Sequence, residues 1–201
     1  MMLPTHALVG LALAAPLAAS VPELAPAALL GGFIGGIFPD LDLYAGHRKT
    51  LHYPVLYPIA AAPAALAALV WTGPLLVAVA LFLLGAAAHC RMDIYGGGLE
   101  LRPWEGTSER AVYDHIRGEW LAPRRAVAYD GSPGDLALSA AVGVPLLVVL
   151  DGAFVWGVAA ALGVATAYVT LRRRLADLAP TVFGYVPERF AEYVPQRYVA
   201  E

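Results

Sequence analysis

The chain has 201 residues, of which 59% are hydrophobic and only 14% are charged, and its mean hydropathy is +0.64. Soluble globular proteins carry roughly 25% charged residues, so the composition is typical of a single membrane-embedded domain. The formal net charge of −3 leaves no strongly basic surface, and no nucleic acid is expected as a partner. A single cysteine excludes an internal disulfide framework and a cysteine-rich zinc site.

Six apolar stretches follow one another along the chain: 3–19, 24–38, 55–71, 75–90, 136–150 and 153–171. Each comes near the roughly 20 residues that a helix needs to cross about 30 Å of hydrocarbon, although the second and fifth are short. The first stretch resembles a signal peptide, but no Lys or Arg precedes it and a second stretch follows at once, so we expect no cleavage. The sequence therefore predicts an all-α, polytopic membrane protein with about six transmembrane helices.

The charged residues predict the orientation of this bundle. All 13 Lys and Arg residues and all five His residues fall on what would be one side of the membrane, at the ends of the stretches, in the connections between them or in the tail. By the positive-inside rule both termini are cytoplasmic, and Trp71 and Trp156 lie at the outer interface. We expect a multi-pass protein of the cell (inner or plasma) membrane. Its membrane domain spans residues 1–175, with a cytoplasmic loop at 94–135, and a cytoplasmic or interfacial tail follows at 176–201.

Two polar segments have a recognisable pattern. In the long loop, Thr107 or Ser108 can cap a helix with a loosely amphipathic face. We expect this cytoplasmic loop helix to cover the bundle at the interface, rather than to recognise a substrate. Its apolar face comprises Val112, Tyr113, Ile116, Trp120 and Leu121. In the tail, residues 185–190 and 193–198 repeat the pattern Tyr-Val-Pro-x-Arg-aromatic, which suits either an interfacial segment or a docking strip.

Ionisable side chains end the second and fourth apolar stretches. His89 and Asp93 are four residues apart, so on a helix they share one face and can bind the same metal ion. Pro39 favours an extended exit from the second helix, in which Asp40 and Asp42 point to the same side. Two carboxylates at such a short distance repel each other unless a cation lies between them or one of them keeps its proton. A helix end with solvated acids is the competing interpretation; acids at a helix C-terminus oppose the helix dipole.

Histidines begin the first and third stretches, at His6 and His52. His47 lies in the loop before the third stretch, where a solvated side chain and a metal ligand are equally expected. Arg48 and Lys49 follow His47 and can hold an anionic group such as a phosphate. They are equally well explained as markers of the cytoplasmic side.

A bundle brings the ends of four successive helices together at one membrane level. The candidate metal ligands are His6, Asp40, Asp42, His47, His52, His89 and Asp93. Imidazole and carboxylate ligands suit a divalent metal, zinc first and then manganese. Because so many ligands exceed the needs of one tetrahedral ion, we expect one or two ions, which can clamp the oxygens of a phosphoryl transfer. The expected catalytic residues are Asp40 or Asp42, which would take a proton from water, and Arg48.

Four motifs in this order resemble those of the YdjM-type membrane-bound metal-dependent hydrolases: Thr5-His6, Pro39-Asp-Leu-Asp42, His47-Arg-Lys-Thr-Leu-His52 and His89-x-x-x-Asp93. The resemblance covers residues 1–175, and that family is distantly similar to the zinc-dependent phospholipase C and P1 nuclease group. It implies that His52, His89 and Asp93 share one ion and that His6 contributes to another. One of Asp40 and Asp42 would be a ligand or a base.

The chain departs from the family pattern in two places. Tyr53 stands where the family usually has Ser after the second loop histidine. A later His/Glu pair for a third ion is also missing, because His115 and Glu119 have helical spacing but lie in the long loop.

The sequence favours a metal-dependent hydrolase of a phosphoester or lipid-like substrate at the cytoplasmic membrane face, with membrane lipid as its surroundings. One alternative is a proton- or ion-coupled transporter. Transporter sites lie near the membrane midplane, where the last two helices offer only Ser139, Thr166 and Tyr168. The other alternative is a scaffold or regulator with a structural metal site, which would lack an open coordination position. Cys90, next to His89, is expected to be a packing residue.

Overall fold

The computed structural model describes residues 1–198, which are mostly helical. Its α-helices are α1 (Leu3–Ser20), α2 (Ala25–Ile37), α3 (Leu56–Val70), α4 (Pro74–Tyr95), α5 (Pro133–Val149) and α6 (Gly152–Phe183). Short 3-10 helices are η1 (Pro22–Leu24), η2 (Phe38–Asp42), η3 (Pro103–Glu105), η4 (Glu188–Tyr193) and η5 (Gln196–Tyr198). Strands β1 (Val112–Asp114) and β2 (Glu119–Leu121) form an antiparallel hairpin.

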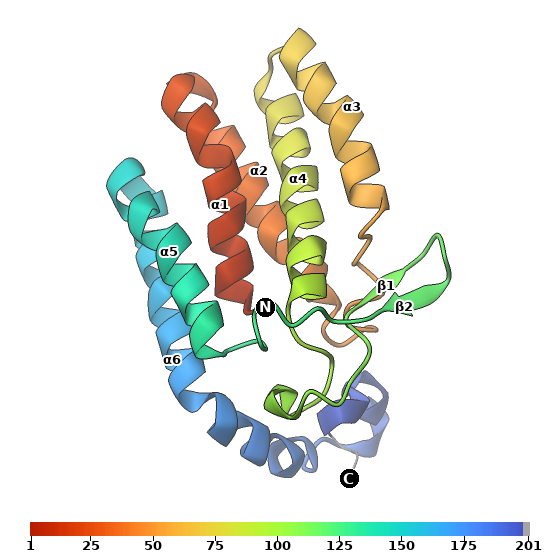
Figure 1. Cartoon of the computed structure of the whole chain (residues 1–201). Helices are drawn as coiled ribbons and strands as arrows, with labels where there is room; N and C mark the ends of the chain where they lie inside the picture. The colour runs from red at the N-terminus through yellow and green to blue at the C-terminus, as the bar shows by residue number, and fades with distance from the viewer. Residues whose placement is uncertain (199–201) are drawn as a thin grey trace.

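The helices pack side by side in one bundle. Helices α1, α2 and α4 form its centre, α3 packs on α4, and α5 and α6 pack against the opposite side of α1 (Figure 1). Glycines allow the central helices to touch through their backbones, as small residues do in membrane proteins. A Cβ at Gly10 would overlap the carbonyl oxygen of Gly32, and a Cβ at Gly36 would lie 2.5 Å from the carbonyl oxygen of His6. This contact holds the start of α1 against the end of α2.

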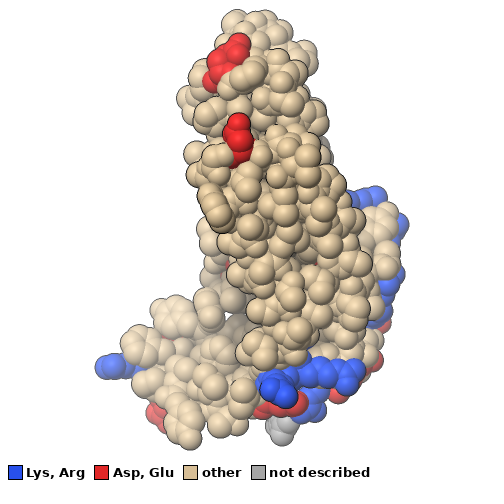
Figure 2. Space-filling model, turned by 90° about the vertical axis from the view of Figure 1, so that its left-hand side faces the viewer, with Lys and Arg blue, Asp and Glu red and all other residues tan. Residues whose placement is uncertain are grey.

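Within the described residues, four helical segments are long and apolar enough to cross a membrane: Leu3–Ser20, Pro22–Asp42, Pro74–Tyr95 and Gly152–Phe183. Helices α3 and α5 are also apolar but shorter. Their outer faces expose large apolar side chains, such as Leu69 and Val148. Lys and Arg gather over the lower part of the molecule, while the upper surface is uncharged apart from acidic groups near its end (Figure 2). This surface is that of a membrane-associated protein, because soluble monomers rarely expose such large apolar areas.

The structure confirms that each of the six apolar stretches is helical. The last helix is longer than expected, since α6 continues past residue 171 to Phe183. Arg172 and Ala176 are buried in this extension, where Arg172 donates a hydrogen bond to the carbonyl oxygen of Asp130. The extension therefore packs against the connection between α4 and α5, and the first residues of the expected tail are part of α6.

The predicted cytoplasmic loop helix is wrong, because its residues form the β1–β2 hairpin. Val112 pairs with Leu121, and Tyr113 pairs with Trp120. At the turn, the Asp114 carboxylate accepts hydrogen bonds from the backbone N–H groups of Ile116 and Arg117, an arrangement that commonly stabilises turns. Gly118 closes the turn with a φ of 71°. β-Branched and aromatic residues on both sides of this turn favour strands, and this preference outweighs the weak helical pattern.

The extended exit predicted after the second helix is also wrong. Phe38–Asp42 forms the 3-10 helix η2, which continues directly from α2. Pro39 is compatible with this arrangement because it lies in the first turn, where its missing N–H is not needed. As a result Asp42 contacts Nδ1 of His52, whereas Asp40 lies near Nε2 of His52 and of His89.

Candidate metal centre

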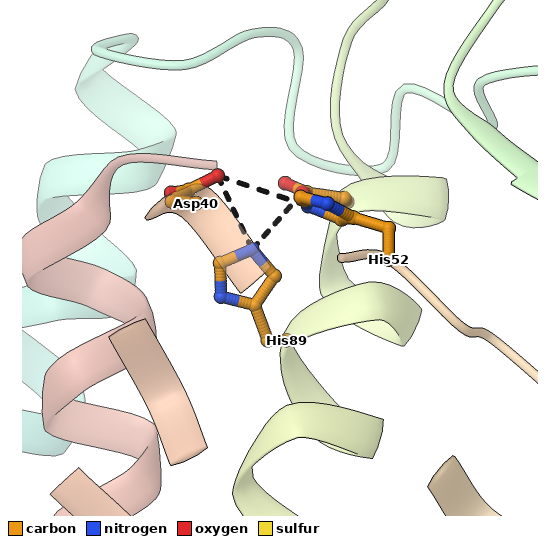
Figure 3. A group of neighbouring side chains, drawn as sticks. Asp40, His52 and His89 are labelled. Carbon is orange, nitrogen blue, oxygen red and sulfur yellow. Dashed lines mark ion pairs between the residues drawn. The ribbon is translucent and has the colours of Figure 1, made fainter. Parts of the chain in front are cut away.

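Four side chains meet at the polar end of the bundle. Asp40 comes from η2, His52 from the loop before α3, and His89 and Asp93 from the last turns of α4. One ligand atom from each lies within 4.8 Å of all the others. In Figure 3 the side chains of Asp40, His52 and His89 point toward a common centre. We refer to these four residues as the metal group.

The spacing within the metal group fits a single tetrahedral ion. Nε2 of His52 and Nε2 of His89 each lie 3.3 Å from Oδ2 of Asp93, and they lie 3.7 and 3.4 Å from Oδ1 of Asp40. Ligand atoms about 2.0–2.1 Å from zinc at tetrahedral corners are about 3.3 Å apart. The separations are thus those of ligands around one ion.

The second nitrogen of each histidine fixes which atom faces the metal group. Nδ1 of His89 is 2.6 Å from the carbonyl oxygen of Gly36, which can only accept a hydrogen bond, so Nδ1 carries the proton. Nδ1 of His52 is held by Oδ2 of Asp42 at 2.9 Å. Among residues 1–198 neither Nε2 atom has a hydrogen-bond partner, although both are buried. Such unpaired polar atoms are costly, and a bound cation would satisfy both.

Asp42 lies behind the metal group and orients it. Its carboxylate binds His52 on one side and Nδ1 of His47 at 3.1 Å on the other. It also accepts the backbone N–H groups of Leu51 and Arg48. Metal-binding histidines commonly donate their other N–H to a carboxylate in this way. Asp42, expected as a ligand or a base, therefore has both carboxylate oxygens engaged in these four hydrogen bonds.

Arg48 is buried beside Asp93. Its guanidinium is buried, lies 3.3 Å from Oδ1 of Asp93 and donates a hydrogen bond to the carbonyl oxygen of Gly97. Burial opposes its charge, but Asp93 and further carboxylates raise the pKa of Arg48. Its backbone has a φ of 59°, which is unusual for a residue other than glycine. Arg48, expected as a catalytic residue, is thus paired with Asp93.

His6 touches the metal group without belonging to it. Its ring stacks on that of His89 with centroids 3.7 Å apart, and its Nε2 lies 3.1 Å from Oδ1 of Asp93. The amino group of Met1 contacts the same oxygen at 2.5 Å. These contacts and Arg48 occupy Oδ1, so that Oδ2 of Asp93 faces His52 and His89.

His47 also stands next to the metal group. Its Nδ1 is 3.9 Å from Oδ1 of Asp40. Burial lowers the pKa of the imidazole, against the opposite effect of the Asp42 carboxylate, and so favours the neutral form. Asp42 holds Nδ1, which leaves Nε2 of the neutral ring to act as a proton acceptor. His47 is therefore a base candidate.

Sequence reasoning missed a buried network that places α1. The Asp135 side chain, at the start of α5, accepts hydrogen bonds from Oγ1 of Thr5 at 2.7 Å and from the backbone N–H of Met2 at 2.8 Å. Ser139 completes the network through Thr5. The signal was an acidic residue and a serine, four residues apart, on one face of an apolar helix.

Other candidates lie apart from the metal group. His115 is exposed on the hairpin, where its Nε2 is 2.7 Å from the carbonyl oxygen of Lys49, and Glu119 is exposed as well. Cys90 is fully buried and packs against Tyr57 and Ala86, as expected for a packing residue.

The metal group is open on one side. The side chain of Asp40 is 19% exposed, whereas those of His52, His89 and Asp93 are exposed by at most 1%. A ligand can therefore approach only past Asp40. Comparison with protein-family models, with curated proteins and with solved structures finds no match for this chain.

Proposed function

We propose that this protein is a multi-pass membrane enzyme that hydrolyses a phosphoester with a divalent metal, zinc or manganese, at the cytoplasmic membrane face. The observation that carries the proposal is the pair of buried Nε2 atoms of His52 and His89, which face two carboxylates at the separations of tetrahedral ligands. Ligands of this mixed type are those of hydrolytic zinc sites.

The metal group would hold the ion through the three buried residues His52, His89 and Asp93, and the partly exposed Asp40 would leave the fourth position to water or substrate. A divalent ion in such a site lowers the pKa of water and polarises a phosphoryl oxygen. His47 would take the proton of the attacking water through Nε2, because Asp42 holds Nδ1 of the ring. The opening at Asp40 supports an enzyme over a structural metal site, since structural sites are usually closed.

We further propose the topology and the family. Six helices would span the membrane with both termini in the cytoplasm; the gathering of Lys and Arg at one end of the bundle supports this orientation (Figure 2). The protein would be a YdjM-type hydrolase, which is supported by the position of His52, His89 and Asp93 in one metal group.

Hydrolysis of two generic substrates, p-nitrophenyl phosphate and bis(p-nitrophenyl) phosphate, and of phospholipid vesicles tests the proposal. We expect activity in detergent-purified protein that is lost with a chelator and restored by zinc or manganese. His52→Gln should remove at least 90% of the metal-dependent rate, because it removes a ligand.

His115→Gln is the matched control, since it changes a surface histidine outside the metal group, and it should keep full activity. Activity that is insensitive to chelator, or equal in the two variants, would contradict the proposal.

A further inference from the structure

A cavity of about 570 Å³ lies beside the metal group. Three polar segments form its walls: the loop after η2 (residues 43–47), the connection after α4 (residues 99–110) and the tail (residues 192–197). Helices α1 to α6 contribute none of its lining residues. The cavity therefore belongs to the polar end of the molecule, not to the apolar bundle.

His47 connects the cavity to the metal group. It lines the cavity, and its Nδ1 is 3.9 Å from Oδ1 of Asp40. Because His47 lies both on the cavity wall and beside Asp40, the cavity offers an approach to the site past His47.

The cavity carries groups that suit a phosphate. Both Arg110 and Arg197 line it. Within residues 1–198, neither Arg110 nor Arg197 forms an ion pair with a carboxylate. The ion pairs of exposed and partly exposed arginines involve other residues. Nε of Arg197 is buried without a hydrogen-bond partner. Arginine is the side chain best suited to bind phosphate oxygens in a bidentate manner.

The cavity also carries acceptors. Glu100 lines it, and both carboxylate oxygens of Glu100 are buried without a hydrogen-bond partner in the described part of the chain. Glu192 is a second acidic residue of the wall. A ligand that satisfied both charge types would carry a phosphate and hydrogen-bond donors.

We propose that this cavity binds a water-soluble phosphoester, whose organic part carries hydroxyl or amino groups, and that this substrate reaches the metal group from the aqueous side. The inference rests on the proposed function and deepens it. Arg110 and Arg197 hold the phosphate, and Glu100 accepts hydrogen bonds from the organic part. A bilayer lipid would need a lateral opening between the helices, but the walls of this cavity contain no residue from them.

Cysteine labelling tests the inference without relying on activity. Ser108→Cys places a thiol in the cavity wall, whereas Thr107→Cys places one on the neighbouring position, which does not line the cavity. The native Cys90 is fully buried and should not react. The probe is iodoacetamide, a small neutral reagent, with inorganic phosphate as the competing ligand and the metal content of each sample measured alongside.

We expect phosphate to slow the labelling of Ser108→Cys at least fivefold and to leave Thr107→Cys unchanged. Adding Arg110→Gln and Arg197→Gln to Ser108→Cys should abolish this protection. If only vesicles of anionic phospholipid protect Ser108→Cys, the inference is overturned while the hydrolase proposal stands. Phosphate protection in a protein that binds no zinc or manganese would contradict the hydrolase proposal and support the cavity assignment.

Discussion

At the scale of single residues, the site depends on which atom of each side chain is already engaged. Gly36 and Asp42 hold the Nδ1 atoms of His89 and His52, so both Nε2 atoms face the metal group. Arg48 and His6 occupy one oxygen of Asp93 and leave the other for the ion. The residues behind the ligands are thus as important for the geometry as the ligands themselves.

Asp42→Asn tests this orienting role. The amide keeps the shape of the carboxylate but weakens the hydrogen bonds to His52 and His47. We expect zinc affinity to fall about 10–100-fold, as measured by competition with a chromogenic chelator. Asp151→Asn, in the connection between α5 and α6, should leave the affinity unchanged; an equal loss there would contradict the role of Asp42.

Arg48→Gln tests the role of the buried cation. Without it, Asp93 loses its partner at 3.3 Å, and breaking a buried ion pair typically costs about 3–5 kcal/mol. We expect a clearly lower melting temperature in detergent. Arg117→Gln, which removes an arginine that is 69% exposed, should change the melting temperature little. A phosphate-binding role of Arg48 would instead show as lost phosphate affinity with unchanged stability.

At the scale of elements, glycine contacts decide how closely α1, α2 and α4 approach. A Cβ at Gly36 would press on the backbone of His6 at the point where α1 meets α2. The sequence predicts the end of each helix at which the site lies. The close approach of the three helices to one another depends on these glycines.

Gly36→Ala should therefore move α1 away from α2 and weaken both zinc binding and stability. Gly163→Ala is the matched control in α6, because a Cβ there meets no atom within 4 Å; it should stabilise the protein by up to about 1 kcal/mol through helix propensity. Thermal melting and zinc titration of both variants give the comparison. Unchanged zinc binding in Gly36→Ala would contradict the role of the helix contact.

The spacing of His89 and Asp93 on a helix was enough to predict that they meet, and the structure brings both into the metal group. The position of Asp42 was not predictable in the same way, because a 3-10 turn after α2 rotates it away from Asp40. The hairpin was not predicted because the Asp114 carboxylate, which accepts hydrogen bonds from backbone N–H groups in the turn, outweighs a weak helical period. The secondary structure of long apolar segments can thus be predicted from the sequence, whereas that of short polar segments depends on local contacts.

At the scale of the whole molecule, the polar end and the apolar bundle have separate roles. The bundle supplies α4 and the ends of α1 and α2, which carry His89, Asp93, His6 and Asp40. The loops and the tail supply the cavity beside them. In the function that we propose, the helix bundle would position the metal group and the segments at the polar end would meet the substrate.

The proposed orientation predicts which cysteines react from outside the cell. Asp151→Cys, in the connection between α5 and α6, should react in intact cells with a membrane-impermeant maleimide. Ser108→Cys should react only after permeabilisation. The reverse pattern would contradict the cytoplasmic position of the site.

Metal content per chain, measured by elemental analysis of detergent-purified protein after reconstitution with zinc or manganese, tests the central claim most directly. We predict about one ion per chain, as the single tetrahedral group implies. It should be lost in His89→Gln and kept in His115→Gln. Absence of bound metal in the unaltered protein, or equal metal content in both variants, would contradict the account.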